Sequence, residues 1–147
     1  MNTQERNKAT FTKLIDEVIN TGKLDLSAEL LTVDRPDHQE LGLPPDLTKG
    51  YAGFQRTVGM FREAFPDLRF KSELMIAEGD LVLSNNTITG THRAPFIGVP
   101  PTGKTFRLTA LDICRFNEAG KISEHWGVMD MMSLMLQLGA IPPPGGR

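Results

Sequence analysis

Apolar residues recur with a helical period in two stretches of the first half of the chain. Spacings of three and four residues place each set on one face of a helix. Gly22 suits the left-handed position after the first helix, and Pro66 cannot continue the second. The pattern predicts helices over about 2–21 and 48–65, a helical turn over 26–31, and an irregular, proline-rich segment over 32–50. The two stripes are Phe11, Leu14, Ile15, Val18 and Ile19, then Tyr51, Phe54, Val58, Phe61 and Phe65.

The period changes from 3.6 to two after residue 67. Leu68, Phe70, Leu74 and Ile76 alternate with mostly polar residues, which predicts a half-buried strand with these four side chains inward. Further strands are expected over 81–92, 105–116 and 121–130, with a loop over 93–104, an apolar helix over 131–138 and a loose tail over 142–147. Helices followed by an antiparallel meander indicate an α+β fold, and 147 residues suit one domain, 1–147.

The last predicted hairpin brings acidic residues onto an apolar face. Asp112 is the one polar residue among the even-numbered positions 106–116. A three-residue loop over 118–120 would place Asp112 opposite Trp126 and Leu108 opposite Asp130. We therefore expect Trp126 and Asp130 to share the inward face with Asp112, and His125 to point away. Glu124 also falls on this inward face, which warns of a bulge or a wide cavity.

Carboxylates on an apolar face are costly. An unpaired buried carboxylate raises its pKa to avoid ionising, and a general base works best with a pKa near the working pH. Asp112 and Asp130 are therefore candidate acid/base groups of a pocket. Two alternatives stay open: either aspartate could pair with an arginine such as Arg107 or Arg115, and Asp130 could cap the helix that begins at residue 131.

Two of the three histidines are further candidates for the pocket. His38 lies in the irregular segment and His92 begins the long loop; either could equally be a hydrogen-bonded structural residue. The histidines show no metal-ligand spacing, and the single cysteine, Cys114, indicates packing. The sequence predicts neither a metal nor a cofactor.

Composition and charge exclude some partners. Sixteen basic and 18 acidic residues give a net charge of −2, which does not favour nucleic-acid binding. No apolar run approaches the roughly 20 residues of a membrane span, and the N-terminus is polar. We expect a cytoplasmic protein without a membrane partner.

Several motifs together resemble one known family. They are GTHRAPFIGVPPTGK at 90–104, the LDICRF strand, AGKISEHWGVMD, and a Leu/Met helix ending in QLG. This combination, over nearly the whole chain, resembles the SnoaL-like polyketide cyclases, or ester cyclases, of the nuclear transport factor 2-like superfamily. The resemblance implies a cone-shaped, cystatin-like half-barrel in which a curved antiparallel sheet packs against N-terminal helices.

The resemblance also implies an activity. Family members carry out a cofactor-free intramolecular aldol cyclisation, in which an aspartate removes an acidic C–H proton. By position this acid/base is Asp130, while Asp112 stands where the cyclases have neutral or imidazole groups. His38 falls where the family has a polar pocket residue and His92 belongs to its GTH motif; both are predicted binding residues, together with Trp126 and Asp112.

Three functional hypotheses follow. The first is an enzyme that acts on a small apolar carbonyl compound with Asp130 as base. The second is a non-catalytic small-molecule-binding domain of the same fold, and the third is an assembly domain whose interior is filled. A homodimer through the sheet is expected, because Thr109, Leu111 and Ile113 form an apolar outer face and the family usually pairs there.

Overall fold

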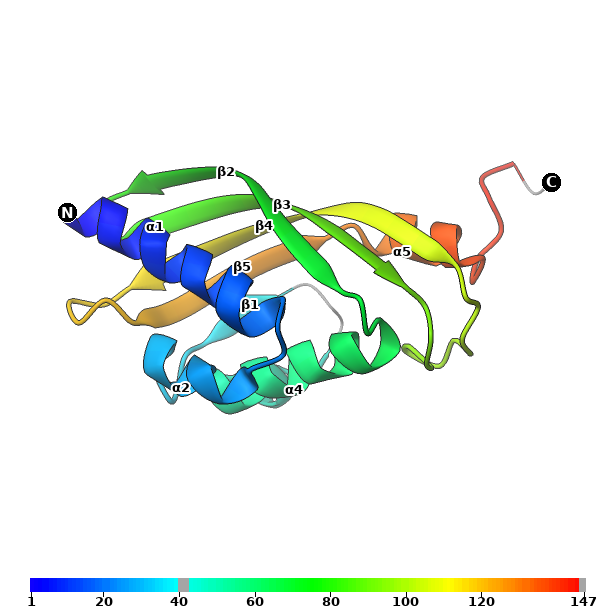
Figure 1. The fold of residues 1–147 in the computed structure, drawn as a ribbon, viewed down its shortest axis with the longest axis horizontal. Helices are drawn as coiled ribbons and strands as arrows, with labels where there is room; N and C mark the ends of the chain where they lie inside the picture. The colour runs from blue at the N-terminus through cyan, green and yellow to red at the C-terminus, as the bar shows by residue number, and fades with distance from the viewer. Residues whose placement is uncertain (40–42, 146–147) are drawn as a thin grey trace.

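Helices cover one side of a five-stranded sheet in the computed structural model, which describes residues 1–39 and 43–145 (Figure 1). The helical elements confirm the predicted ones, with π-helical turns in η1 and a short added helix, α3. They are α1 (Thr3–Lys13), η1 (Leu14–Ile19), η2 (Leu24–Leu26), α2 (Ser27–Leu30), α3 (Pro45–Thr48), α4 (Gly50–Ala64) and α5 (Met131–Leu138). Residues 142–145 of the predicted tail form no helix or strand, and 146–147 lie outside the described residues.

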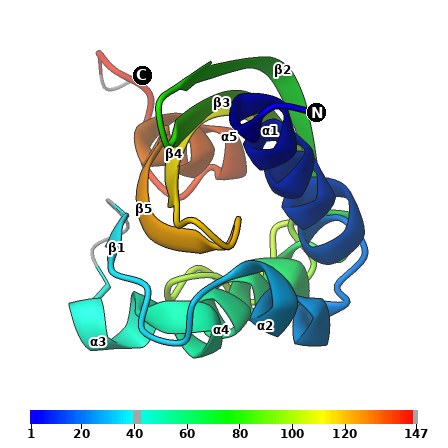
Figure 2. The ribbon, with the colours of Figure 1, turned by 90° about the vertical axis from the view of Figure 1, so that its left-hand side faces the viewer.

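The sheet has the order β1-β5-β4-β3-β2. Its strands are β1 (Asp37–Gln39), β2 (Arg69–Glu78), β3 (Leu81–Thr91), β4 (Thr105–Phe116) and β5 (Ile122–Met129). Strands β2 to β5 form the predicted antiparallel meander, whereas β1 pairs parallel to β5 and was not predicted. Seen end-on, the sheet curls over, and α1 and α4 close its open side (Figure 2). The predicted α+β class is confirmed.

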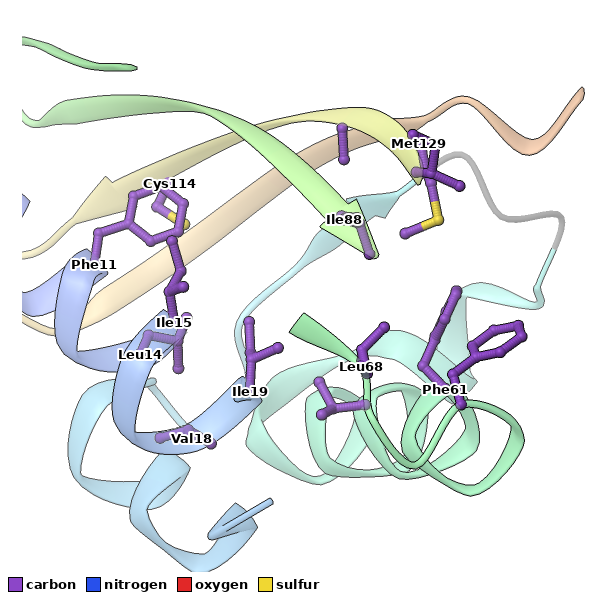
Figure 3. Packing of buried hydrophobic residues seen from close by; sticks show 14 of the residues in the cluster. Phe11, Leu14, Ile15, Val18, Ile19, Phe61, Leu68, Ile88, Cys114 and Met129 are labelled. Atoms are coloured by element: carbon purple, nitrogen blue, oxygen red, sulfur yellow. The ribbon is translucent and has the colours of Figure 1, made fainter. Parts of the chain in front are cut away.

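The core lies between the concave face of the sheet and the helices. Phe11 and Ile15 extend from the N-terminal helical stretch towards Cys114 of β4, and Phe61 of α4 lies at the other end (Figure 3). Burying one large apolar side chain contributes about 1.5–3 kcal/mol, so this face holds the helices on the sheet.

A bulge in β5 reverses the predicted orientation of its side chains. Asn117 pairs with Lys121 as expected, but Phe116 faces Ile122 while Arg115 faces Glu124, so Ser123 is an extra residue. Side chains alternate along a strand, and one extra residue exchanges the two faces beyond it. The expectation that Glu124 and Trp126 point inward and His125 outward is therefore wrong.

A second bulge has the same effect in β2. Ser72 pairs with Asn86 and Leu74 with Asn85, so Glu73 is the extra residue. Leu68 is buried, as predicted, but Leu74 and Ile76 are 51% and 54% exposed, which contradicts their predicted inward orientation. Met75 and Ala77 pack against the core in their place.

Candidate functional site

A cavity of about 70 Å³ lies between the curled sheet and the helices. Most of its wall is apolar, with Phe11 and Ile15 from the N-terminal helical stretch and Phe54, Val58 and Phe61 from α4. Its volume is about half that of a 150 Å³ cavity that binds benzene, so a ligand of that size or larger requires side chains of the wall to move apart. The polar residues of its lining are Arg35, Asp37, Gln39, Thr57, Asn86, Asp112 and His125.

His125 lies between two carboxylates. Its Nδ1 is 2.8 Å from Asp37 Oδ1 and its Nε2 is 2.9 Å from Asp112 Oδ1. A carboxylate oxygen only accepts, so both ring nitrogens donate and the ring is an imidazolium. Burial lowers the pKa of His125, but the hydrogen bonds and charges of Asp112 and Asp37 outweigh it and raise this pKa to about 9.

Asp37, His125 and Asp112 form a charged row, and Arg35 holds the Asp37 carboxylate at one end of it. Its Nη1 lies 3.2 Å from Asp37 Oδ2, and the two side chains are 2% and 5% exposed. Burial raises the pKa of Asp37, but the hydrogen bonds and charges of His125 and Arg35 bring it below its ordinary value. The Arg35 backbone is fixed as well, because its carbonyl accepts from the Gly50 N–H at the start of α4.

Asn86 holds the second oxygen of Asp112. Its Nδ2 donates to Asp112 Oδ2 at 2.8 Å, while its Oδ1 accepts from Ser84 Oγ at 2.7 Å. Ser72 Oγ lies 2.8 Å from Ser84 Oγ, so hydrogen bonds continue to β2. Because Ser84 donates to the amide oxygen, the amide nitrogen must face Asp112. Asp112 is thereby held as a carboxylate with a hydrogen bond to each oxygen.

Gly127 makes room for the contact between His125 and Asp112. It pairs with Asp112 across β4 and β5. A Cβ atom at Gly127 would lie 2.9 Å from His125 Cε1 and 3.0 Å from Asp112 Oδ1. Real Cβ atoms avoid such distances, so any other residue here would push the imidazole and the carboxylate apart.

The charges that face the cavity balance. Arg35 and His125 are cations, and Asp37 and Asp112 are anions. Burial raises the pKa of the Cys114 thiol, which therefore stays protonated and acts as a packing group, as predicted. Among residues 1–39 and 43–145, the groups that line the cavity therefore sum to zero charge at neutral pH.

The structure brings Asp112 into the cavity, as predicted, but not Asp130. Asp130 is exposed, and its Oδ1 accepts from the Ser133 N–H at 3.0 Å as the N-cap of α5. Its predicted burial is wrong, because Ser123 shifts the register and Asp130 follows the last residue of β5.

The other predicted binding residues lie outside the cavity lining. Trp126 is on the opposite face of β5 from His125, with the His38 ring stacked at 5.3 Å and Arg115 Cζ at 5.6 Å. His38 Nε2 also lies 2.9 Å from Glu124 Oε2. His92 is fully buried behind the Phe65 ring, and its Nδ1 is 3.1 Å from Thr102 Oγ1.

The sequence analysis missed Arg35, Asp37, Asn86 and the inward position of His125. One signal was present for the first two: Arg35, Asp37 and Gln39 are polar at every second position, as on one face of a strand. The doubtful inward position of Glu124 was the only signal of the bulge that turns His125 inward.

Fold and site together define the class. A curled sheet closed by helices around a mostly apolar cavity is the architecture of the nuclear transport factor 2-like α+β proteins. The chain belongs to one family within that class, the SnoaL-like polyketide cyclases, whose sequence profile matches residues 9–138.

Solved structures agree with this family. IdmH from Streptomyces antibioticus, a candidate polyketide cyclase, is 31% identical with a TM-score of 0.77, over 90% of this chain and 98% of its own. AclR from Streptomyces galilaeus, a candidate hydroxylase, is 28% identical with a TM-score of 0.80, over 95% and 99% of the two chains. A candidate SnoaL-like cyclase from Jannaschia sp. CCS1 shares the fold at 24% identity, with a TM-score of 0.84 and 97% of each chain covered.

No curated protein matched the sequence with significance. Within residues 1–39 and 43–145, none of the helices combines the length and the apolar character needed to cross a membrane.

Proposed function

We propose that this protein catalyses cofactor-free proton transfer on a small apolar carbonyl compound, as in an intramolecular aldol cyclisation, with Asp112 as the base. One observation carries the proposal: Asp112 is a carboxylate held on the wall of an otherwise apolar cavity. We assign the base to Asp112 and not to Asp130, because Asp130 is exposed and outside the cavity lining. Membership of the SnoaL-like family supports the reaction class.

The proposed reaction moves one proton out and back. Asp112 takes a proton from a carbon next to a carbonyl, and the C–H electron pair moves onto the carbonyl oxygen as an enolate. The enolate carbon attacks a second carbonyl of the same molecule, and the proton returns from Asp112 to the new alkoxide. Each Asp112 oxygen accepts one hydrogen bond and keeps a lone pair for the substrate. The apolar wall keeps water from the enolate.

Exchange of a carbon-bound proton tests this proposal directly. The wild type is expected to speed the exchange of the α-proton of ethyl 2-methylacetoacetate in D₂O, followed by NMR. Asp112→Asn should lower the rate about 100-fold or more, since general bases contribute roughly 10²–10⁴. Asp130→Asn makes the same change of charge at the surface, keeps an N-capping side chain, and should leave the rate unchanged. Equal losses in the two variants would contradict the assignment to Asp112.

A second candidate function is ligand binding without a reaction. This function is favoured because His125 already donates hydrogen bonds to both Asp37 and Asp112, so these three charged side chains have partners without a substrate. It predicts that ethyl 2-methylacetoacetate shifts the His125 ring resonances while exchange in the wild type stays at the buffer rate. That result would exclude the enzymatic proposal.

We further propose structural roles for the residues outside the cavity lining. His38 joins Trp126 and Glu124 on the outer face and thereby holds β1, with Asp37, against β5. His92 fixes the loop over 93–104 through Thr102.

A homodimer through the convex face of the sheet is also proposed. Leu74, Asn85, Leu111 and Val128 form one row in register across β2 to β5. Leu111 and Val128 are 45% and 59% exposed in the single chain. A neighbouring row holds Ile76, Leu83, Ile113 and Trp126. Contiguous exposed apolar surface of this kind marks interaction sites.

A further inference from the structure

We infer that Arg35 is the recognition site for an anionic oxygen of the ligand, so that the cavity binds an enolate, or a carboxylate in its place, in preference to a neutral analogue. The inference rests on the proposed function of the cavity. It specifies in addition that the bound species is an anion and that Arg35 is the residue that recognises this charge.

Arg35 has donor capacity left in a buried position. It lines the cavity and is 2% exposed. Its Nη1 contacts Asp37, while its Nε has no hydrogen-bond partner among residues 1–39 and 43–145. A guanidinium carries five N–H donors, and a desolvated donor without an acceptor is costly. An oxygen of the ligand next to Arg35 would remove part of that cost.

Arg35 is also the cation that remains free for a ligand. The ionisable groups that face the cavity are Arg35 and Asp37 from the β1 side, Asp112 and Cys114 from β4, and His125 from β5; among the described residues α1, η1 and α4 add none. Both N–H groups of His125 are committed to Asp37 and Asp112. Arg35 is therefore the cation of the described lining with N–H groups left for an anionic oxygen, while Gln39 and Thr57 add only neutral donors.

The charge balance explains why an anion should be preferred. The resting wall is neutral. When Asp112 takes a proton from the substrate, the wall becomes +1 and the substrate −1, and the two attract strongly in surroundings of low dielectric constant. A ligand that arrives as an anion meets the same guanidinium of Arg35, whereas a neutral analogue gains no such attraction.

Calorimetry with 3-methylbutanoate and the isosteric 3-methylbutanamide tests the inference. The wild type should bind the carboxylate more tightly than the amide. Asp112→Asn removes a negative charge from the wall beside the site, so the carboxylate should bind more tightly still.

Two variants isolate Arg35. Arg35→Gln should weaken carboxylate binding about 10- to 100-fold, as expected for a lost charge-assisted hydrogen bond, and change amide binding less than about twofold. Because this variant leaves Asp37 with one partner fewer and can fold poorly, Arg35→Gln with Asp37→Asn serves beside it. The double variant removes one cation and one anion, and the remaining His125 and Asp112 charges cancel. A loss of the preference for the carboxylate in this variant is therefore due to the missing Arg35 side chain and not to a change in net charge.

The outcomes separate this inference from the proposed reaction. A carboxylate that binds the wild type no better than the amide, or not at all, overturns the inference, as does a preference that survives in the double variant. If α-proton exchange fails but the Arg35-dependent preference is present, the cavity is an anion-binding site without the reaction. If exchange is found without the preference, only the inference about Arg35 fails.

Discussion

At the residue scale, His125 links the site to the stability of the fold. Its pKa is about 9 in the folded chain against an ordinary value of 6.5. Because the folded value is the higher one, the contribution is fully present below about pH 6.5 and is lost as the pH rises through about 9. One unit of pKa corresponds to about 1.4 kcal/mol, so the contribution is about 3 kcal/mol.

We therefore expect the free energy of unfolding to fall by about 3 kcal/mol between pH 6.5 and pH 9.5. Urea denaturation at the two pH values measures it. His125→Gln should lack most of this fall. His38→Gln is the matched control, because His38 is half exposed and should leave the fall intact. The same pH dependence in His125→Gln and the wild type would show that His125 does not carry it.

Individual residues differ in how far the sequence could predict them. The inward position of Asp112 was predictable, because β4 keeps a regular alternation along its length. His125 and Trp126 were assigned to the wrong faces, since the position of the extra residue Ser123 depends on how β4 and β5 pair, and Glu124 on the predicted inward face was its only trace in the sequence. Arg35 was missed because its position depends on contacts with distant elements.

At the element scale, the loop over 93–104 contains a strained turn. Phe96 is buried and forms a two-residue turn with Val99, through backbone hydrogen bonds of 3.0 and 2.9 Å. The two central residues, Ile97 and Gly98, have φ values of +46° and +76°. Two positive values are typical of the tight hairpin turn that favours Asn-Gly, whereas a β-branched residue is strained there.

Ile97→Asn is expected to stabilise the protein by about 1 kcal/mol, because the left-handed conformation costs an ordinary residue roughly 1–2 kcal/mol and asparagine tolerates it better. Thermal unfolding should show a rise of a few degrees in the midpoint. Ile97 is 52% exposed, so little packing is lost. Ile97→Val retains the branched Cβ and should give no such rise. A midpoint for Ile97→Asn at or below the wild-type value would argue against strain at this turn.

The elements themselves were largely predictable. Both helical stripes follow from local periods, turn and loop residues separate the four antiparallel strands, and Pro66 and Gly22 mark the helix ends. Strand β1 was not, because its three residues are ordered by parallel pairing with β5, more than 80 positions away in the sequence. Pairing of that kind is set by the folded whole.

At the scale of the whole molecule, the convex face should decide the oligomeric state. A lysine placed in an apolar interface would carry an unpaired charge there. The proposed dimer is therefore expected to dissociate into monomers when Leu111→Lys and Val128→Lys are combined, as measured by sedimentation velocity at micromolar concentration. Val33→Lys is the control, because Val33 is 71% exposed on a segment outside the sheet. A wild type that sediments as a monomer would refute the proposed dimer.

The bulge at Ser123 has a consequence for comparing relatives. Loss of that single codon would restore continuous pairing, with Glu124 still opposite Arg115 and His125 still opposite Cys114, so His125 would keep its inward position although its distance from the hairpin turn in the sequence had changed. An alignment column that is matched without a gap at this point would then transfer the role of an interior group to an exterior one. A residue's role should therefore be transferred between relatives according to the face of the strand on which the residue lies. The identity of the aligned residue is a poor guide next to an insertion or deletion.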